Sequence, residues 1–266
     1  MYGINGQAIV DLDPYVDVAG FNALVEECTL GLARSQWDVG SFGPGVYDKD
    51  LTRDLYAIET GVYRPPRAGR RPHPDAEYLR GALRNMTINQ RRMYLKLRYG
   101  LYNSGHSVYL RQPTDNNYMV LNQPELNRWT ANAAQFPGLV AWIKQLPFAG
   151  LGRILFFINE HCCPVVEHSD LHSSDVARGY VADRPHTHEF LWIRPSVENA
   201  KGFYVLDERD GTKHHVKGNA AWFNSFDVHG ADAGPTMTWS LRVDGQFTDA
   251  FRNTLLQQED SAAVTA

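Results

Sequence analysis

The stretch Thr236-Met-Thr-Trp-Ser-Leu-Arg-Val-Asp-Gly-Gln-Phe247 decides the fold. Its polar residues, among them Thr238, Ser240 and Arg242, alternate with large apolar residues. Because successive side chains of a β-strand point to opposite faces, this period of two predicts a strand with one apolar and one polar face. The turn signal Ala233-Gly-Pro235 comes just before the stretch and lets the chain reverse.

Further short β-type runs precede this strand in the second half of the chain. Turn signals such as Asp210-Gly211 separate them. Several short strands at this spacing predict an antiparallel sandwich or barrel, and we favour a jelly roll, a double-stranded β-helix built from two sheets. The other predicted strands are Arg153–Asn159, Phe190–Arg194, Gly202–Leu206, His214–Lys217 and Ala221–Phe226.

The part of the chain before Gly150 has apolar residues at helical spacing instead. We therefore expect an α+β protein with a mainly β core: residues 1–149 form a mainly helical buttress, residues 150–250 form the jelly roll, and 1–266 is a single domain. The stretch Gly40–Arg71 is long enough to be a lid. The expected helices are Val18–Ser35 behind an Asp17 cap, Asp75–Arg84, Asn89–Tyr102, Glu125–Gln135 and Leu139–Leu146.

Most of the ten histidines lie in the predicted β-core, so spacing has to identify the functional ones. In His168-Ser-Asp170 the two outer residues are i and i+2, which point the same way in an extended chain and can face one metal ion. A third ligand has to come from a distant strand, and His229 lies just after the apolar run Ala220–Phe226. Two imidazoles and one carboxylate on one face of iron(II) leave the other positions open for a bidentate oxo acid and dioxygen.

In their order and setting, His168-Ser-Asp170, His229 and Arg242 resemble the iron(II)/2-oxoglutarate-dependent oxygenase superfamily. The resemblance covers Gly150 to Phe247, and it is nearest to the branch that contains aspartyl/asparaginyl hydroxylases and bacterial proline hydroxylases. It implies iron(II) bound by the triad, 2-oxoglutarate as cosubstrate, dioxygen as oxidant and ascorbate as a stimulant of turnover.

The resemblance also implies roles for residues beside the metal. Arg242 is expected to form a bidentate pair with the distal carboxylate of 2-oxoglutarate. Ser240 and Thr238, which alternate with Arg242 along the strand, are expected to add hydroxyl donors. His188, at the start of an inner strand, is expected to contact the cosubstrate or the substrate.

The implied reaction is hydroxylation of an unactivated C–H bond in a small amino-acid-like substrate. A residue carried by a peptide or protein is the alternative substrate. Two other classes of function stay open. One is a cupin-type iron enzyme that uses no oxo acid, and the other is a metal-binding β-sandwich without turnover.

Other polar residues of the β-core are also candidates for the site. His186-Thr-His188 is the rival metal pair, but no glutamate follows at the spacing that cupin-type sites use. Arg194 either holds a substrate carboxylate or ends its strand in solvent. Asn159 and Trp222 either line the pocket or belong to the core.

The net charge, the cysteines and the apolar runs of the sequence indicate which partners and which cellular compartment to expect. The net charge is −4, and the one basic cluster, Arg64–Arg71, is short, so we expect no nucleic-acid partner. Three cysteines, of which Cys162 and Cys163 are adjacent, do not make a disulfide framework, which favours a reducing cytoplasmic location. No apolar run approaches the roughly 20 residues that a membrane span needs, so we expect no membrane partner.

Overall fold

The computed structural model describes residues 1–35, 106–113, 123–159, 164–170 and 188–256. All of these residues belong to one compact unit. The predicted single domain over 1–266 also includes residues outside these ranges, so it stays a prediction. None of the helices within the described ranges is long and apolar enough to cross a membrane.

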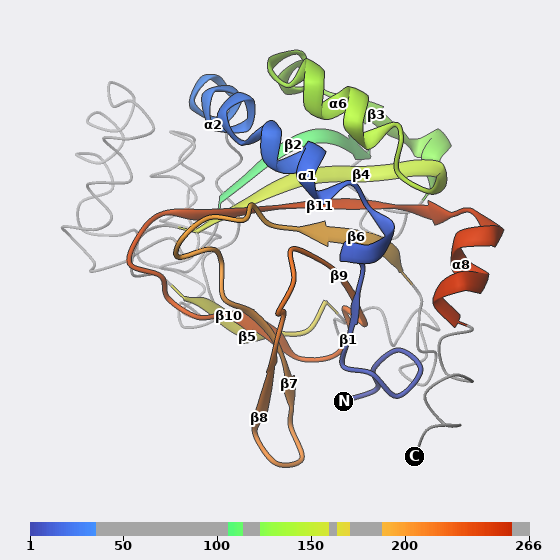
Figure 1. Cartoon of the computed structure of the whole chain (residues 1–266), viewed down its shortest axis with the longest axis vertical. Helices are drawn as coiled ribbons and strands as arrows, with labels where there is room; N and C mark the ends of the chain where they lie inside the picture. The colour runs from blue at the N-terminus through green and yellow to red at the C-terminus, as the bar shows by residue number, and fades with distance from the viewer. Residues whose placement is uncertain (36–105, 114–122, 160–163, 171–187, 257–266) are drawn as a thin grey trace, which may run out of the picture. The chain divides into compact units, whose positions relative to one another are not determined.

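Two antiparallel sheets form the core, and Figure 1 shows them as an upper and a lower layer. In the seven-stranded sheet the strands run in the order β1 (Ile9–Asp11), β9 (Ala220–Phe223), β6 (Glu189–Ile193), β11 (Thr238–Phe247), β4 (Phe148–Asn159), β2 (His106–Pro113) and β3 (Asn127–Trp129). The order in the four-stranded sheet is β5 (Val165–His168), β10 (His229–Ala231), β7 (Phe203–Asp207) and β8 (Thr212–His215).

From β4 onward the chain passes back and forth between the two sheets. β4 lies in the large sheet, β5 in the small one and β6 in the large one again. The β7–β8 hairpin then belongs to the small sheet, β9 to the large, β10 to the small and β11 to the large. This winding is the topology of a jelly roll, and it confirms the predicted β-core.

The central strand β11 separates an apolar face from a polar one, as its sequence predicts. Its Trp239 ring packs against Phe21 of α1 (Val18–Ala23) and against Phe156 of β4. Since side chains alternate along a strand, Ser240 and Arg242 point the other way, into the space between the sheets. Both are buried, with exposed fractions of 0% and 4%.

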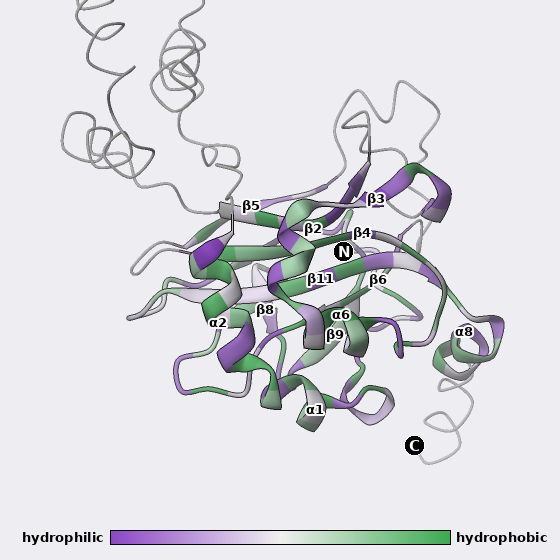
Figure 2. Cartoon of the chain, turned by 90° about the horizontal axis from the view of Figure 1, so that it is seen from above, coloured by the Kyte–Doolittle hydropathy of each residue, from purple (hydrophilic) through white to green (hydrophobic). Residues whose placement is uncertain are grey.

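Helices cover the outer face of the large sheet. Figure 2, which looks down on this face, shows α2 (Val25–Arg34) and α6 (Pro137–Ile143) near β2, β4 and β11, with apolar positions in green. The Asp17 carboxylate accepts a hydrogen bond from the Gly20 amide, 2.8 Å away, which caps α1 as expected. A further helix, α8 (Asp249–Leu256), follows β11.

The helical N-terminal half is not confirmed. The expected helix Val18–Ser35 consists of two helices, α1 and α2, which are separated at Leu24. The expected helix Glu125–Gln135 is wrong: it is replaced by two short 3-10 turns, Pro124–Leu126 and Ala131–Gln135, on either side of β3. Pairing of β3 with β2 supplies backbone hydrogen bonds that a helix would have made internally.

Other predictions for this half have mixed outcomes. The expected helix Leu139–Leu146 exists as α6 but begins two residues earlier, at Pro137, a residue favoured in the first turn of a helix. Strands β1 and β2 are additional to the predicted ones. The expected helices Asp75–Arg84 and Asn89–Tyr102, and the lid Gly40–Arg71, lie outside the described residues.

Candidate metal centre

Pairing of β5 with β10 brings the two predicted histidine ligands together. His168 and His229 are direct partners in the antiparallel register, and their ring centroids are 4.4 Å apart. Two further hydrogen bonds fix the chain after His168. The Asp170 amide donates to the Ser225 carbonyl at 3.0 Å, and the Ser169 hydroxyl donates to the Phe226 carbonyl at 2.8 Å.

His168, Asp170 and His229 each offer one ligand atom, and these three atoms lie within 4.8 Å of one another. His229 is buried, Asp170 is half-buried and His168 is exposed, so the cluster lies where the interior meets solvent. Imidazole nitrogen and carboxylate oxygen suit iron(II), and three such ligands leave coordination positions free. The residues present therefore fit the metal that the sequence motif implies.

His229 has the ring orientation that a metal ligand requires. Its Nδ1 lies 2.8 Å from the carbonyl oxygen of Asp227. A carbonyl can only accept a hydrogen bond, so Nδ1 carries the proton and the lone pair is on Nε2. This Nε2 faces Asp170, with 3.9 Å between it and Oδ1. Burial lowers the pKa of His229 to about 4, so the ring is neutral near pH 7 and free to bind a metal.

Asp170 is held by an arginine from the opposite sheet. Arg242 of β11 donates from Nη1 to the Asp170 Oδ2 across 3.1 Å. Burial by itself raises the pKa of Asp170, but the neighbouring His229 and Arg242 outweigh burial and hold this pKa well below its usual range. The carboxylate is therefore ionised and oriented as a ligand.

Behind Arg242 lies a buried charge network. The Arg242 Nε donates to Asp244 Oδ1 at 2.7 Å. Arg153 of β4 donates to the other carboxylate oxygen of Asp244, also at 2.7 Å. The guanidinium carbon of Arg242 lies 3.9 Å from the centre of the Phe190 ring. Of the three guanidinium nitrogens of Arg242, only Nη2 has no hydrogen-bond partner among the described residues. The predicted contact of Arg242 with 2-oxoglutarate stays a prediction, and the structure adds a contact with the candidate metal ligand Asp170.

Ser240, the second predicted cosubstrate residue, has a partner that sequence reasoning missed. Lys201 precedes β7, and its Nζ lies 3.4 Å from the Ser240 hydroxyl oxygen. The exposed fraction of Lys201 is 5%. One signal was available in the sequence: Lys201 lies two residues before Phe203, so strand alternation places it on the inner face with that residue.

His188, the third predicted cosubstrate residue, lies beside the loop that fixes the metal ligands. Its Nδ1 is 3.5 Å from the hydroxyl of Ser225, the residue whose carbonyl binds the Asp170 amide. Burial, and then the charge of Arg242, lowers the pKa of His188. A role for His188 toward cosubstrate or substrate stays a prediction.

Other candidates have structural roles. Arg194 donates to the backbone carbonyls of Lys201, Val216, Lys217 and Gly218, so it neither ends in solvent nor has nitrogens free for a substrate. Ala221 pairs with Trp192, which pairs with Arg242, so Trp222 is on the opposite face and packs in the outer core. Asn159 is buried at the end of β4. Residues His186, Cys162 and Cys163 lie outside the described ranges.

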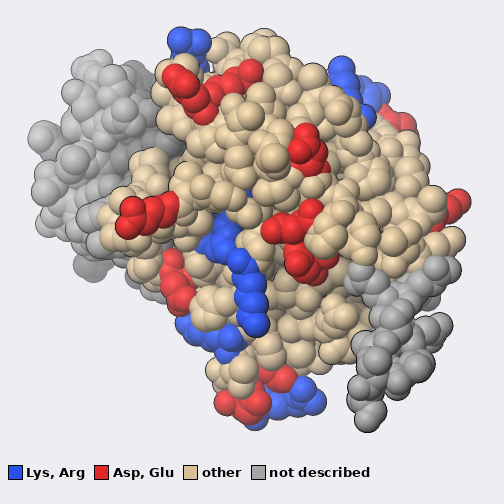
Figure 3. All heavy atoms as spheres, in the orientation of Figure 1, with Lys and Arg blue, Asp and Glu red and all other residues tan. Residues whose placement is uncertain are grey.

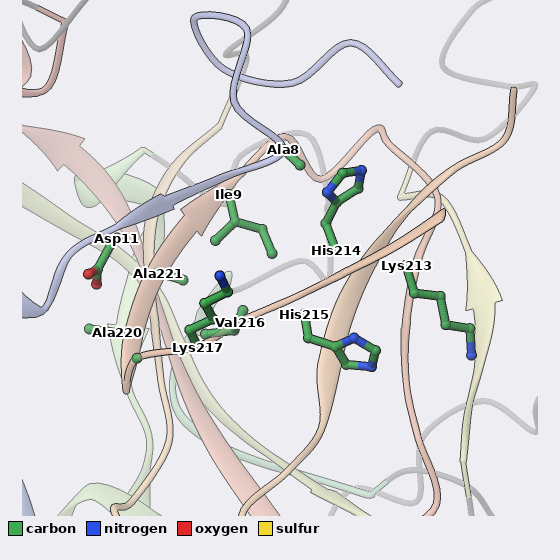
Figure 4. A pocket seen from close by; sticks show the side chains of 11 residues that line it. Ala8, Ile9, Asp11, Lys213, His214, His215, Val216, Lys217, Ala220 and Ala221 are labelled. Carbon is green, nitrogen blue, oxygen red and sulfur yellow. The ribbon is translucent and has the colours of Figure 1, made fainter. Parts of the chain in front are cut away.

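A cavity of about 550 Å³ lies elsewhere, along β8 and the segment that leads into β1 (Figure 4). Its lining includes Ile9, Asp11, His214 and Lys217 but none of the predicted site residues. Figure 3 shows acidic and basic side chains interspersed on the face that it draws. His214 and His215 lie on β8, the edge strand of the four-stranded sheet.

Known proteins resemble this chain in fold but not in sequence. No protein-family model matches the sequence, and no curated protein matches it. Among solved structures, the fold is similar to a 2OG-Fe(II) oxygenase family oxidoreductase from Burkholderia pseudomallei, at 9% identity over 86% of this chain and 90% of that chain, with a TM-score of 0.34.

Two prolyl hydroxylases are also similar in fold. One is a prolyl-4-hydroxylase from Pseudomonas putida, at 9% identity over 84% of this chain and 99% of that chain, with a TM-score of 0.29. The other, from Trichoplax adhaerens, is in complex with a peptide fragment of hypoxia inducible factor, at 10% identity, 89% and 96% coverage and a TM-score of 0.32. A shared fold does not fix the reaction or the substrate, because the side chains of the site select them.

Proposed function

We propose that this protein is a non-haem iron(II)- and 2-oxoglutarate-dependent dioxygenase that hydroxylates an unactivated C–H bond. The observation that carries the proposal is the meeting of His168, Asp170 and His229, whose ligand atoms lie within 4.8 Å of one another where the interior meets solvent. Asp170 and His229 are already ionised and neutral, respectively, as ligands of a divalent cation must be.

In this proposal the triad holds iron(II), which activates dioxygen when an oxo acid is bound beside it. The balanced reaction converts substrate, dioxygen and 2-oxoglutarate into hydroxylated substrate, succinate and carbon dioxide. The protein contributes position and charge. Arg242 orients Asp170, and the Asp227 carbonyl orients the His229 ring.

Aromatic side chains exclude water from the inner side of the site. The rings of Phe203 and Phe223 lie 5.7 Å and 5.3 Å from the His229 ring, centroid to centroid. Both residues are buried. A dry wall on this side strengthens the electrostatic contacts of the site and leaves the exposed His168 side for entry of substrate.

For the substrate, we infer a small amino-acid-like molecule, with a peptide-borne residue as the alternative. His188 contributes to its binding or to that of the cosubstrate in this proposal. The support is the position of His188, next to Ser225 and the loop that carries Asp170.

The test combines iron binding with product formation. Purified protein is titrated with iron(II) without oxygen, and then incubated with 2-oxoglutarate, ascorbate, oxygen and a panel of amino acids, N-acyl amino acids and short peptides. We expect one iron per chain and succinate release that rises with the true substrate. Iron binding without succinate release from any mixture would favour the cupin-type enzyme or the binding protein instead.

Asp170→Ala is the key variant, and Asp232→Ala is its matched control. Asp232 is also an aspartate at the small sheet, but it is exposed and pairs with His215 at 2.7 Å. The Asp170 variant is expected to lose iron binding and succinate release, and the Asp232 variant to keep both. Equal activity in the two variants contradicts the proposed metal site.

A further inference from the structure

Lys201 is a buried cation that the proposed metal chemistry does not use. Its exposed fraction is 5%, although lysine is rarely buried unless it is paired. Its Nζ contacts the hydroxyl of Ser240 at 3.4 Å and lies 5.6 Å from the centre of the Phe157 ring. No carboxylate within the described ranges forms an ion pair with it. A buried ammonium in such surroundings is a site for an anion.

The position of this cation relative to the metal ligands follows from the strands. Lys201 reaches from the small sheet to Ser240 of the large sheet, so the contact crosses the interior between the two layers seen in Figure 1. Ser240 and Arg242 share one face of β11, and two residues of a strand span roughly 7 Å. The Lys201–Ser240 pair therefore lies one such step along β11 from Arg242, the residue that contacts the candidate metal ligand Asp170.

Arg242, unlike Lys201, already has carboxylate partners. Its Nη1 binds Asp170 and its Nε binds Asp244. A guanidinium in contact with a metal ligand lies at the metal end of any molecule that binds the metal. Its remaining nitrogen, Nη2, therefore faces the near end of such a molecule rather than the far end.

Two hydrogen bonds hold the backbone of Lys201 in place, which orients its side chain for binding. Its carbonyl accepts a hydrogen bond from Arg194 Nη1 at 2.6 Å and another from the Phe203 amide at 3.0 Å. This explains what the half-buried Arg194 does for the site: it holds the segment from which the lysine side chain enters the interior.

We propose that Lys201 Nζ and Ser240 Oγ together bind the far carboxylate of a dicarboxylic oxo acid, while Arg242 serves its metal end. The inference rests on the proposed function, and it changes the residue that selects the cosubstrate. The ammonium and the hydroxyl both donate to the carboxylate oxygens, which supplies the counter-charge that Lys201 lacks among the described residues. Burial also lowers the pKa of Lys201 to about 7, which an anion bound there would raise again.

Binding rather than turnover tests this proposal. Protein loaded with nickel(II), which replaces iron without oxygen chemistry, is titrated calorimetrically with 2-oxoglutarate and with 2-oxopentanoate. The two acids share the metal-binding end, and only the first has a far carboxylate. Wild-type protein is expected to prefer 2-oxoglutarate by roughly 10- to 100-fold, the size of hydrogen bonds to a charged group.

Lys201→Met is expected to bind the two acids equally, with its affinity for 2-oxopentanoate unchanged. Ser240→Ala should reduce the preference in part. Lys144→Met, at an exposed lysine of the loop after α6, is the matched control and should keep the full preference. The melting temperature of each variant shows that it is folded.

Two results overturn the proposal in distinguishable ways. If Lys201→Met keeps the preference for 2-oxoglutarate, the far carboxylate is bound elsewhere and the dioxygenase proposal is unaffected. If the nickel-loaded wild-type protein binds neither acid, the proposed function itself fails, and the role of Lys201 fails with it.

Discussion

Arg242 of β11 and Asp170 beyond β5 are joined by a hydrogen bond of 3.1 Å that spans the two sheets of the jelly roll. The carboxylate that it holds is one of three candidate ligands for iron. The position of a candidate metal ligand beside one sheet thus depends on a cation from the other. Outer contacts of this kind orient ligands and tune metal affinity.

Removal of Arg242 is therefore expected to weaken metal binding. In Arg242→Met, Asp170 loses its hydrogen bond and part of the charge that keeps its pKa low. Affinity for iron(II), measured by anaerobic titration, should fall by about 10- to 100-fold. Arg252→Met is the control, because Arg252 pairs with Glu189 and Asp249 instead. Unchanged affinity in the Arg242 variant would show that Asp170 is held without it.

Asp227 is expected to act on the metal through His229. Its carboxylate accepts backbone hydrogen bonds from Tyr2 and Gly3, and its carbonyl accepts the His229 Nδ1 proton. Asp227→Ala removes the bonds that hold the segment before His229 in place. The affinity for iron should then fall by about tenfold, because the His229 imidazole is less well oriented.

Asp13→Ala is the matched control for Asp227. The Asp13 carboxylate also binds backbone amides, those of Asn219 and Ala220, but it makes no contact with the ligand residues. Both variants should lower the free energy of unfolding, measured with urea. Only the Asp227 variant should change iron affinity, and equal affinities in the two variants refute a role for the segment before His229.

Gly230 allows the close pairing that brings the histidines together. A Cβ atom at this position would lie 2.8 Å from the Val165 carbonyl oxygen and 3.0 Å from the Tyr204 hydroxyl. Gly230→Ala is therefore expected to push β5 away from β10 and to lower iron affinity by more than the Arg242 variant does. Gly211→Asn is a control at a turn with φ +77° and open space around it, and it should leave affinity unchanged.

Because the pKa of Lys201 is lowered, we expect the stability of the protein to depend on pH near and above pH 7. This pKa is about 7 in the folded protein and about 10.4 in an unfolded chain. Between these values the unfolded chain binds the additional proton, so the contribution of Lys201 to the free energy of unfolding rises with pH. The penalty for burying the charged amine is complete below pH 7 and is relieved above it.

The Ser240 hydroxyl and the Phe157 ring, which contact the Lys201 amine, do not titrate in this range, and burial alone lowers the pKa. Lys201→Met should be more stable than wild-type protein below pH 7. This advantage should shrink by up to about 1.4 kcal/mol per pH unit above pH 7, as measured by urea unfolding. The same advantage at every pH would mean that the buried amine keeps its proton, with the same pKa in the folded protein as in the unfolded chain.

Six strands of the two sheets, β4, β6, β7, β8, β9 and β11, were predictable because their signals are local, whereas β5 and β10, which carry His168 and His229, were not predicted. The alternation in Thr236–Phe247 placed Ser240 and Arg242 on one face of a strand, and the structure has them there. The spacing of His168 and Asp170 similarly allowed one shared ion. The helix expected at Glu125–Gln135 was wrong because its residues pair with β2, and no feature within that segment encodes a partner strand.

By itself, then, the sequence determined most of the strands after Gly150, the polar face of β11 and three side chains that can meet at a metal. Only the tertiary structure decided what those side chains touch. Arg242 binds Asp170, Lys201 is buried against Ser240, and Arg194 holds the backbone of Lys201. Periodicity acts over a few neighbouring residues, whereas these contacts cross between sheets or join distant strands, where only the packing of the complete fold sets burial and charge.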